Sequence, residues 1–113
     1  MADFGELVAA LRSWTRNHDP HVRAAVELLI THGHWLRRED FTSECVRQVG
    51  GVTVIDWNHA AGPWYASSSE VAMLDLAVAI GSDRYRLSRM DDENAGAIVK
   101  AFAAALAVGA RRG

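Results

Sequence analysis

The order of secondary-structure signals between residues 19 and 66 constrains the fold of this chain more than any other feature. Asp19 followed by Pro20 predicts a helix start, because Asp is a favoured N-cap and Pro is favoured in the first helical turn. Apolar residues at helical spacing come next, and Gly33 is a suitable C-terminal stop. The first half of this segment is therefore expected to be a capped helix followed by a short turn.

A second helical pattern starts near Arg38 and is expected to stop at Gly50 and Gly51. Residues 52–57 are rich in β-branched side chains and predict a strand. The partner strand is expected at residues 63–66, where a proline suits the first position or an edge. The whole segment thus predicts helix, turn, helix and a strand pair.

Helix, tight turn, helix and strand pair is the order found in winged helix-turn-helix modules. On this interpretation the second helix would offer Arg38, Thr42, Arg47 and Gln48 to a DNA major groove, and residues 58–62 would form the wing. The charges argue against it: residues 33–66 hold three Arg against four acidic residues. Phosphate contacts need surface cations, so DNA binding is the second interpretation and not the first.

Three further helices are predicted outside this segment. Residues 3–16 carry an apolar stripe, and Ser67 and Glu70 have the spacing of a capping box that opens a helix over residues 67–80. This helix is apolar around most of its circumference and is expected to be central to the core, although Asp75 within it could be a buried acid. The last helix is expected to follow Asp91, whose side chain can cap it.

These patterns predict a mainly α fold of about five helices with a small β-hairpin or a single strand. The chain of 113 residues and 12.4 kDa is the size of one domain, residues 1–113. Its formal net charge of −2 predicts neither a nucleic-acid footprint nor an acidic tail. Abundant Ala, and Arg in place of Lys except at Lys100, suggest a high-GC bacterium or its phage as the source.

The chain is expected to be cytoplasmic, without a membrane segment. Its first residues are acidic where a signal peptide needs basic ones, and the apolar stretch 95–110 is short and interrupted by Lys100. Cys45, the only cysteine, lies in a helical apolar pattern and is expected to be a buried, inert thiol. The basic residues Arg111 and Arg112 suit the end of a helix.

Enzymatic function finds little support in the motifs. Asp56 and His59 form the one cluster with a catalytic character, so a small hydrolase or metal-dependent enzyme is the third interpretation; an Asp that caps the following segment explains the same pattern. Four of the five His fall in two pairs at the ends of one predicted helix, and His59 lies in the expected wing. The rings of His32 and His34, on either side of a turn, are expected to diverge, which does not suit a metal site. We therefore assign no catalytic residue, metal or cofactor.

The favoured interpretation is a non-enzymatic interaction or regulatory domain that acts by protein–protein contact. Trp57, Trp64 and Tyr65 flank a loop and are the predicted partner-binding residues, since aromatic side chains are enriched at interfaces. A lid over the core is the alternative role for them. The Ala-rich last helix could pack closely against a copy of itself, so a second copy of the chain, in a homodimer, is one expected partner.

Overall fold

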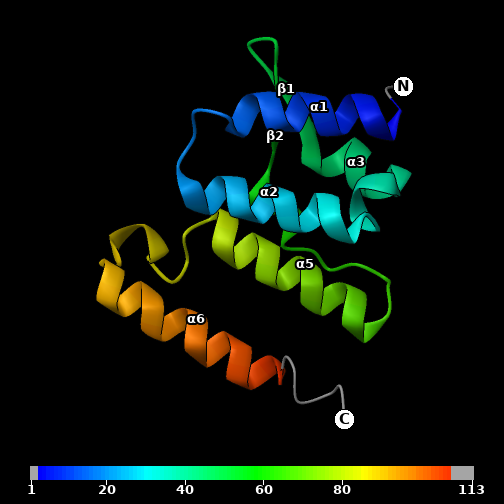
Figure 1. The fold of residues 1–113 in the computed structure, drawn as a ribbon. Coiled ribbons are helices and arrows are strands. Elements are labelled where there is room, and N and C mark those ends of the chain that lie inside the picture. Colours follow the sequence, from blue (N-terminus) through cyan, green and yellow to red (C-terminus); the bar gives the residue numbers. More distant parts are fainter. Residues whose placement is uncertain (1–2, 108–113) are drawn as a thin grey trace.

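The computed structural model describes residues 3–107, and it confirms a mainly α fold with one small hairpin (Figure 1). The elements in chain order are α1 (Phe4–Thr15), α2 (Pro20–His32), the 3-10 helix η1 (Trp35–Arg37), α3 (Glu39–Cys45), β1 (Val46–Val49), β2 (Val52–Ile55), α4 (Trp57–Ala60), α5 (Ser68–Gly81), the 3-10 helix η2 (Leu87–Arg89) and α6 (Asp92–Leu106). Arg111 and Arg112, expected to suit the end of the last helix, lie outside the described residues.

The predicted helix starts are confirmed. The side chain of Asp3 caps α1 by accepting from Glu6 N. Pro20 opens α2 after Asp19, which occupies the N-cap position but makes no side-chain cap hydrogen bond. Ser67 and Glu70 form both hydrogen bonds of a capping box at α5. At the other end of α2, Gly33 adopts the left-handed conformation (φ 77°) and donates its N–H to Leu29 O, as a C-terminal stop should.

The predicted end of the third helix is wrong. α3 ends at Cys45, and the next four residues form β1, which pairs antiparallel with β2 so that Val46 faces Ile55 and Val49 faces Val52. Gly50 (φ 58°) and Gly51 (φ 82°) make the two-residue turn between the strands. Both left-handed residues suit a tight hairpin turn, so here the glycine pair joins two strands and does not stop a helix.

The predicted partner strand and wing loop are also wrong. Residues 63–66 form no strand, because β1 already pairs with β2. The expected wing contains instead the short helix α4, which Asp56 caps by accepting a hydrogen bond from His59 N (3.1 Å). The sequence signal for α4 is Asp56 itself, because an Asp at the N-cap accepts a hydrogen bond from the backbone N–H three residues later, here that of His59.

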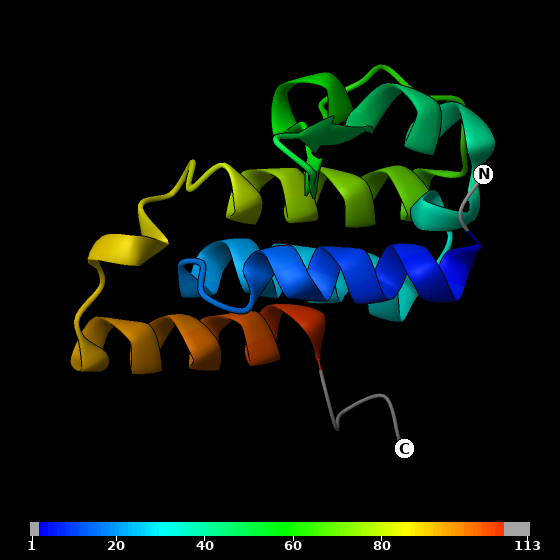
Figure 2. The same ribbon diagram turned by 90° about the horizontal axis from the view of Figure 1, so that it is seen from above.

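The helices form layers around one hydrophobic core. Seen from above, α3, the hairpin and α4 lie on one side of α5, α1 and α2, and α6 lies on the other side (Figure 2). The core cluster draws buried residues from every α-helix except α6 and from η1 and β2: Leu11, Val26, Leu29, Trp35, Leu36, Phe41, Cys45, Ile55, Ala60, Leu74, Ala77 and Val78. Asp75, considered as a buried acid, is exposed.

α6 differs from the other long helices. None of the residues Asp92–Leu106 is buried, and only Ile98 among them is partly covered. The helix nevertheless has a regular N-cap, since Asp91 Oδ1 accepts from Asn94 N (2.8 Å). Within residues 3–107, no helix is both long enough and apolar enough to cross a bilayer.

Candidate functional site

The four residues proposed for DNA readout do not share a helix. Arg38 is the N-cap residue of α3 and Thr42 lies within α3, whereas Arg47 and Gln48 lie on β1. Arg38 donates to both oxygens of Asp40 (2.9 and 2.6 Å) and to Tyr65 O (2.8 Å). Its guanidinium is therefore already engaged within the chain.

The other three side chains also have partners in the chain. Thr42 Oγ1 donates to Glu39 O (3.2 Å), and Gln48 Nε2 donates to Thr53 Oγ1 (2.7 Å). Arg47 Nε donates to Asp56 Oδ2 (2.8 Å). Reading a base edge would require each of these contacts to be given up first, which lowers the net gain from binding.

Asp56 and His59 do come together, with Arg47 as a third member. Asp56 uses one oxygen to cap α4 and the other to accept from Arg47. The hydrogen bond from the His59 amide and the contact with Arg47 hold the pKa of Asp56 below its usual value. The predicted capping role of Asp56 is confirmed, and a carboxylate held ionised with both oxygens in use is poorly suited to take up a proton.

The aromatic residues proposed as a contact surface are separated by burial. Trp57 is partly buried and packs against Gly81, and Trp64 lies with ring centroids 5.9 Å from Trp35. Trp64 Nε1 also donates to Ala60 O (3.0 Å). The two tryptophans thus cover the core, as in the alternative role considered for them, while Tyr65 is 97% exposed.

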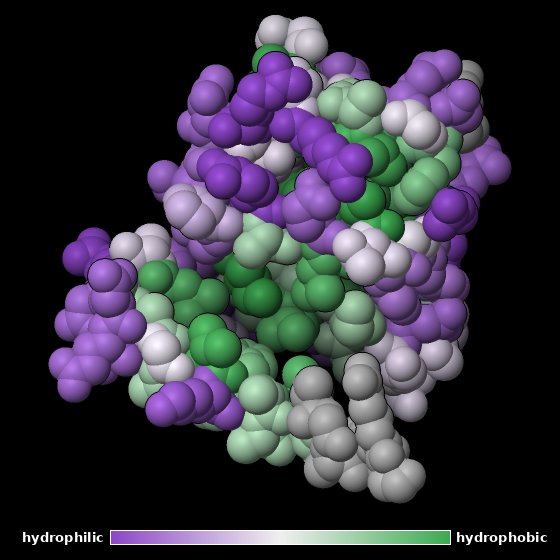
Figure 3. Space-filling view, in the orientation of Figure 1, coloured by the Kyte–Doolittle hydropathy of each residue, from purple (hydrophilic) through white to green (hydrophobic). Residues whose placement is uncertain are grey.

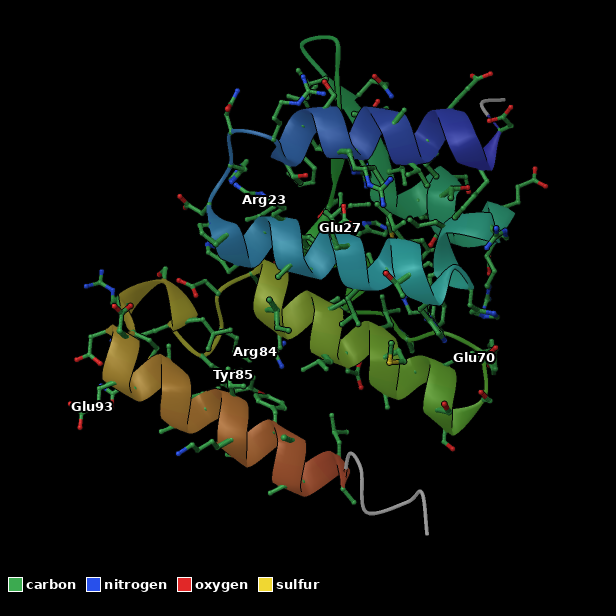
Figure 4. All side chains as sticks on the ribbon, viewed as in Figure 1. Arg23, Glu27, Glu70, Arg84, Tyr85 and Glu93 are labelled. Atoms are coloured by element: carbon green, nitrogen blue, oxygen red, sulfur yellow. The ribbon has the colours of Figure 1, made fainter. Side chains whose placement is uncertain are left out.

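Exposed apolar side chains gather instead around α6. Five of the eight large apolar residues that are exposed in the described chain belong to α6 or to the connector before it, and we call these five the α6 surface: Tyr85, Met90, Val99, Phe102 and Leu106. Figure 3 shows hydrophobic residues spread over the region where α5 and α6 face each other. In Figure 4, Arg84 and Tyr85 project between these helices, whereas Glu93 points away from the body at the start of α6.

The sequence indicated this stripe but not its exposure. Val99, Phe102 and Leu106 have the helical spacing of a core-facing stripe, and such a stripe predicts burial against something. The spacing contains no information about whether that surface belongs to the same chain. The missing signal is three-dimensional: α1, α2 and α5 already enclose the core without α6.

The turn after α2 holds a small polar cluster. His34 Nδ1 lies 2.9 Å from Glu70 Oε2, and the rings of His32 and His34 are 6.0 Å apart. His32 Nδ1 and His34 Nε2 are buried without a hydrogen-bond partner among the described residues. Two such nitrogens fall short of a metal site, and the described residues contain no group of three or more His, Cys, Asp or Glu that could hold an ion.

Cys45 is fully buried at the end of α3, which confirms the position expected from its helical pattern. Burial, with smaller contributions from Glu44 and Asp56, raises the pKa of its thiol to about 12. The thiolate is the reactive form, so a thiol with a raised pKa is unreactive. Cys45 therefore acts as a small apolar side chain in the core.

Comparison of the chain with protein-family models, with curated proteins and with solved structures found no match.

Proposed function

We propose that this chain is a small, non-enzymatic interaction domain that acts by protein–protein contact and self-associates as a homodimer through α6. The observation that carries the proposal is the exposure of the α6 stripe: Val99 is 68% exposed, Phe102 46% and Leu106 56%. Contiguous exposed apolar side chains of this kind mark contact sites in soluble proteins.

The spacing of the stripe fits a helix–helix seam. Ala95, Val99, Phe102 and Leu106 follow one another at intervals of four, three and four residues, which is the alternation of a heptad. Ile98 is the one residue of Asp92–Leu106 that is partly covered, and Val99, the most exposed residue of the stripe, lies on the neighbouring face. α6 can therefore keep its place on the body and still pack against a second copy.

An antiparallel pair of α6 helices suits these residues. If Val99 of one copy lies opposite Phe102 of the other, Ala95 lies opposite Leu106, so that large side chains meet smaller ones. This register also places the acidic first turn, with Asp92 and Glu93, at the far end of the partner helix. An antiparallel pair also brings the positive end of each helix dipole beside the negative end of the other, which favours this arrangement.

The area is adequate for such a contact. The five side chains of the α6 surface expose on the order of 500 Å² together, at the upper end of what a monomer normally shows. With the alanines between them, a two-fold contact approaches the ~800 Å² per partner of a standard interface.

Sedimentation equilibrium of the full chain tests this proposal. We expect a reversible dimer, and we expect Val99→Asp with Phe102→Asp to yield a folded monomer, because two charges would be buried at the seam. Val49→Asp is the matched control, since Val49 is 59% exposed at the hairpin tip and lies far from α6 in the chain. A chain that remains monomeric up to about 1 mM would overturn the proposal, because such weak association corresponds to only ~4 kcal/mol.

A further inference from the structure

A groove on the opposite side of α1 from α6 combines an apolar floor with an acidic rim. It has a volume of about 570 Å³ and lies between the first turns of α1, η1, α3 and the hairpin. This volume is in the range of ordinary ligand sites. The apolar residues that line it are Phe4, Leu7, Ala10, Leu36 and Val46.

The floor is held in place by contacts from below and beside it. Leu36 is only 3% exposed and belongs to the core cluster, which fixes one side of the groove to the body. Phe4 is covered by the Arg37 guanidinium, whose carbon lies 3.7 Å from the ring centroid. Arg37 Nη1 also donates to Gly33 O (3.3 Å), so this cation is engaged and directed at the floor.

The rim carries negative charge that the rest of the chain leaves available. Asp3, Glu6 and Glu39 line the groove, and Asp3 Oδ1 is occupied as the cap of α1. Glu6 and Glu39 form no ion pair with another residue of the described chain. Thr42, Ser43 and Gln48 add neutral polar groups along the other wall. A short segment with small apolar residues and two cations matches this combination.

We infer that the groove takes the arginine-bearing segment, residues 108–113, of a second copy of the chain. That segment reads Val-Gly-Ala-Arg-Arg-Gly, so it pairs small apolar residues with two guanidinium groups. Val108 and Ala110 cover the floor, while Arg111 and Arg112 lie against Glu6 and Glu39. Charge complementarity of this kind fixes register and partner choice more than it adds affinity.

The occupant comes from a second copy because of where α6 lies. α1, which forms one wall of the groove, lies at the other end of the row of helices from α6, with α2 and α5 between them (Figure 1). Six residues span at most about 20 Å, and this length would have to pass around both helices within one molecule. Each copy has one groove and one such segment, so two copies can exchange segments reciprocally and close a dimer. This contact is separate from the α6 contact proposed above and does not depend on the α6 surface.

Fluorescence anisotropy with a labelled peptide of residues 104–113 tests the inference. The receptor is the full chain carrying Arg111→Glu and Arg112→Glu, so that its own segments do not compete. We expect saturable binding with a dissociation constant below about 1 mM, at least about fivefold weaker for Glu6→Gln with Glu39→Gln. Asp92→Asn with Glu93→Gln is the matched control, which removes two acids from α6 and should leave binding unchanged.

A second measurement locates the peptide without relying on a variant. Amide chemical shifts of the same receptor should move at Ala10, Thr42 and Gln48 when the peptide is added. Shifts confined to other elements, or equal loss of binding in the α6 control, would overturn the inference. Binding that survives Val99→Asp with Phe102→Asp separates it from the α6 contact, since that variant removes only the seam.

Discussion

The body of the molecule, which comprises α1 to α5 and the hairpin, and α6 both contain helices with apolar stripes. The body buries its apolar side chains, whereas α6 leaves its own exposed. Helices of the body bury large side chains completely, with Phe41, Leu11 and Trp35 each at 0% exposure. α6 is longer than any of them and as well capped, yet none of the residues Asp92–Leu106 is buried. The difference shows that an amphipathic stripe specifies a helix and a buried face, but leaves open which molecule buries it.

The largest difference in stability is expected between alanine substitutions of two phenylalanines, Phe41 in the body and Phe102 on α6. Phe41→Ala removes a fully buried ring that packs 5.5 Å from Trp35 and 5.3 Å from Trp64, and should lower the free energy of unfolding by about 3–5 kcal/mol. Phe102→Ala removes a ring that is 46% exposed, and at low protein concentration should cost less than about 1 kcal/mol. Urea denaturation measures both. Equal losses would mean that α6 belongs to the folding core of the single chain.

The sequence predicted features that depend on local chemistry better than features that depend on tertiary contacts. Local chemistry placed the helix starts, because Pro20, Ser67 and Asp91 act through neighbours within a few residues. It misplaced the hairpin, because Gly50 and Gly51 suit a helix stop and a tight turn equally well. The pairing of β1 with β2 shows that the two glycines form a hairpin turn. That pairing cannot be read from the glycines or their immediate neighbours.

The predicted partner-binding residues depend on tertiary packing more than the fold does. Trp57 and Trp64 were chosen for residue type, yet both pack on the core beside α5 and α4. The cis peptide between Gly62 and Pro63 and the turn that brings Trp64 back over the core have no counterpart in hydrophobic periodicity. The apolar residues exposed on α6 fit a helical stripe, whose spacing alone does not show which surface covers them.

Alanine substitutions of Gly81 in the body and Gly96 in α6 are expected to change the free energy of unfolding in opposite directions. A methyl group at Gly81 would lie within 2.8 Å of three ring atoms of Trp57, so Gly81→Ala should lower the free energy of unfolding by about 1–3 kcal/mol. At Gly96, in the middle of α6, a methyl group meets nothing within 4 Å. Gly96→Ala should therefore stabilise the helix, by roughly 0.5–1 kcal/mol.

Thermal denaturation of both glycine variants at one concentration distinguishes the two effects. The melting temperature should fall for Gly81→Ala and should not fall for Gly96→Ala. A marked decrease with Gly96→Ala would show that this side of α6 is covered by something the single chain does not provide. A second copy is the first candidate, and the concentration dependence of the decrease would identify it.

Loss of the N-cap of α5 should lower the stability of the whole molecule, whereas loss of the N-cap of α6 should affect that helix alone. Ser67→Ala removes one half of the α5 capping box and should cost about 1 kcal/mol of global stability, because α5 is central to the core. Asp91→Ala removes a cap of similar geometry from α6, where it should mainly raise local fraying. Amide hydrogen exchange measures both effects. Faster exchange throughout the body with Asp91→Ala would contradict the separation of the two regions.

The smallest effect concerns pH and the hairpin side of the body. The amide of His59 and the side chain of Arg47 lower the pKa of Asp56 in the folded state. A carboxyl with a lowered folded pKa adds stability above its unfolded value, near pH 4, and that contribution is lost as the pH falls through the folded value. Asp56→Asn should reduce stability at pH 7 and flatten its decline between about pH 4 and pH 2.

Arg47→Gln provides the matched variant, because it leaves the cap of α4 intact and removes one of the groups that lower this pKa. It should flatten the same pH range, by less than Asp56→Asn does, since the amide of His59 is the larger cause. Urea midpoints measured from pH 2 to pH 7 give both slopes. If Arg47→Gln flattened the range as fully as Asp56→Asn, the ion pair and not the helix cap would dominate, and this corner of the body would depend on an exposed contact that salt can screen.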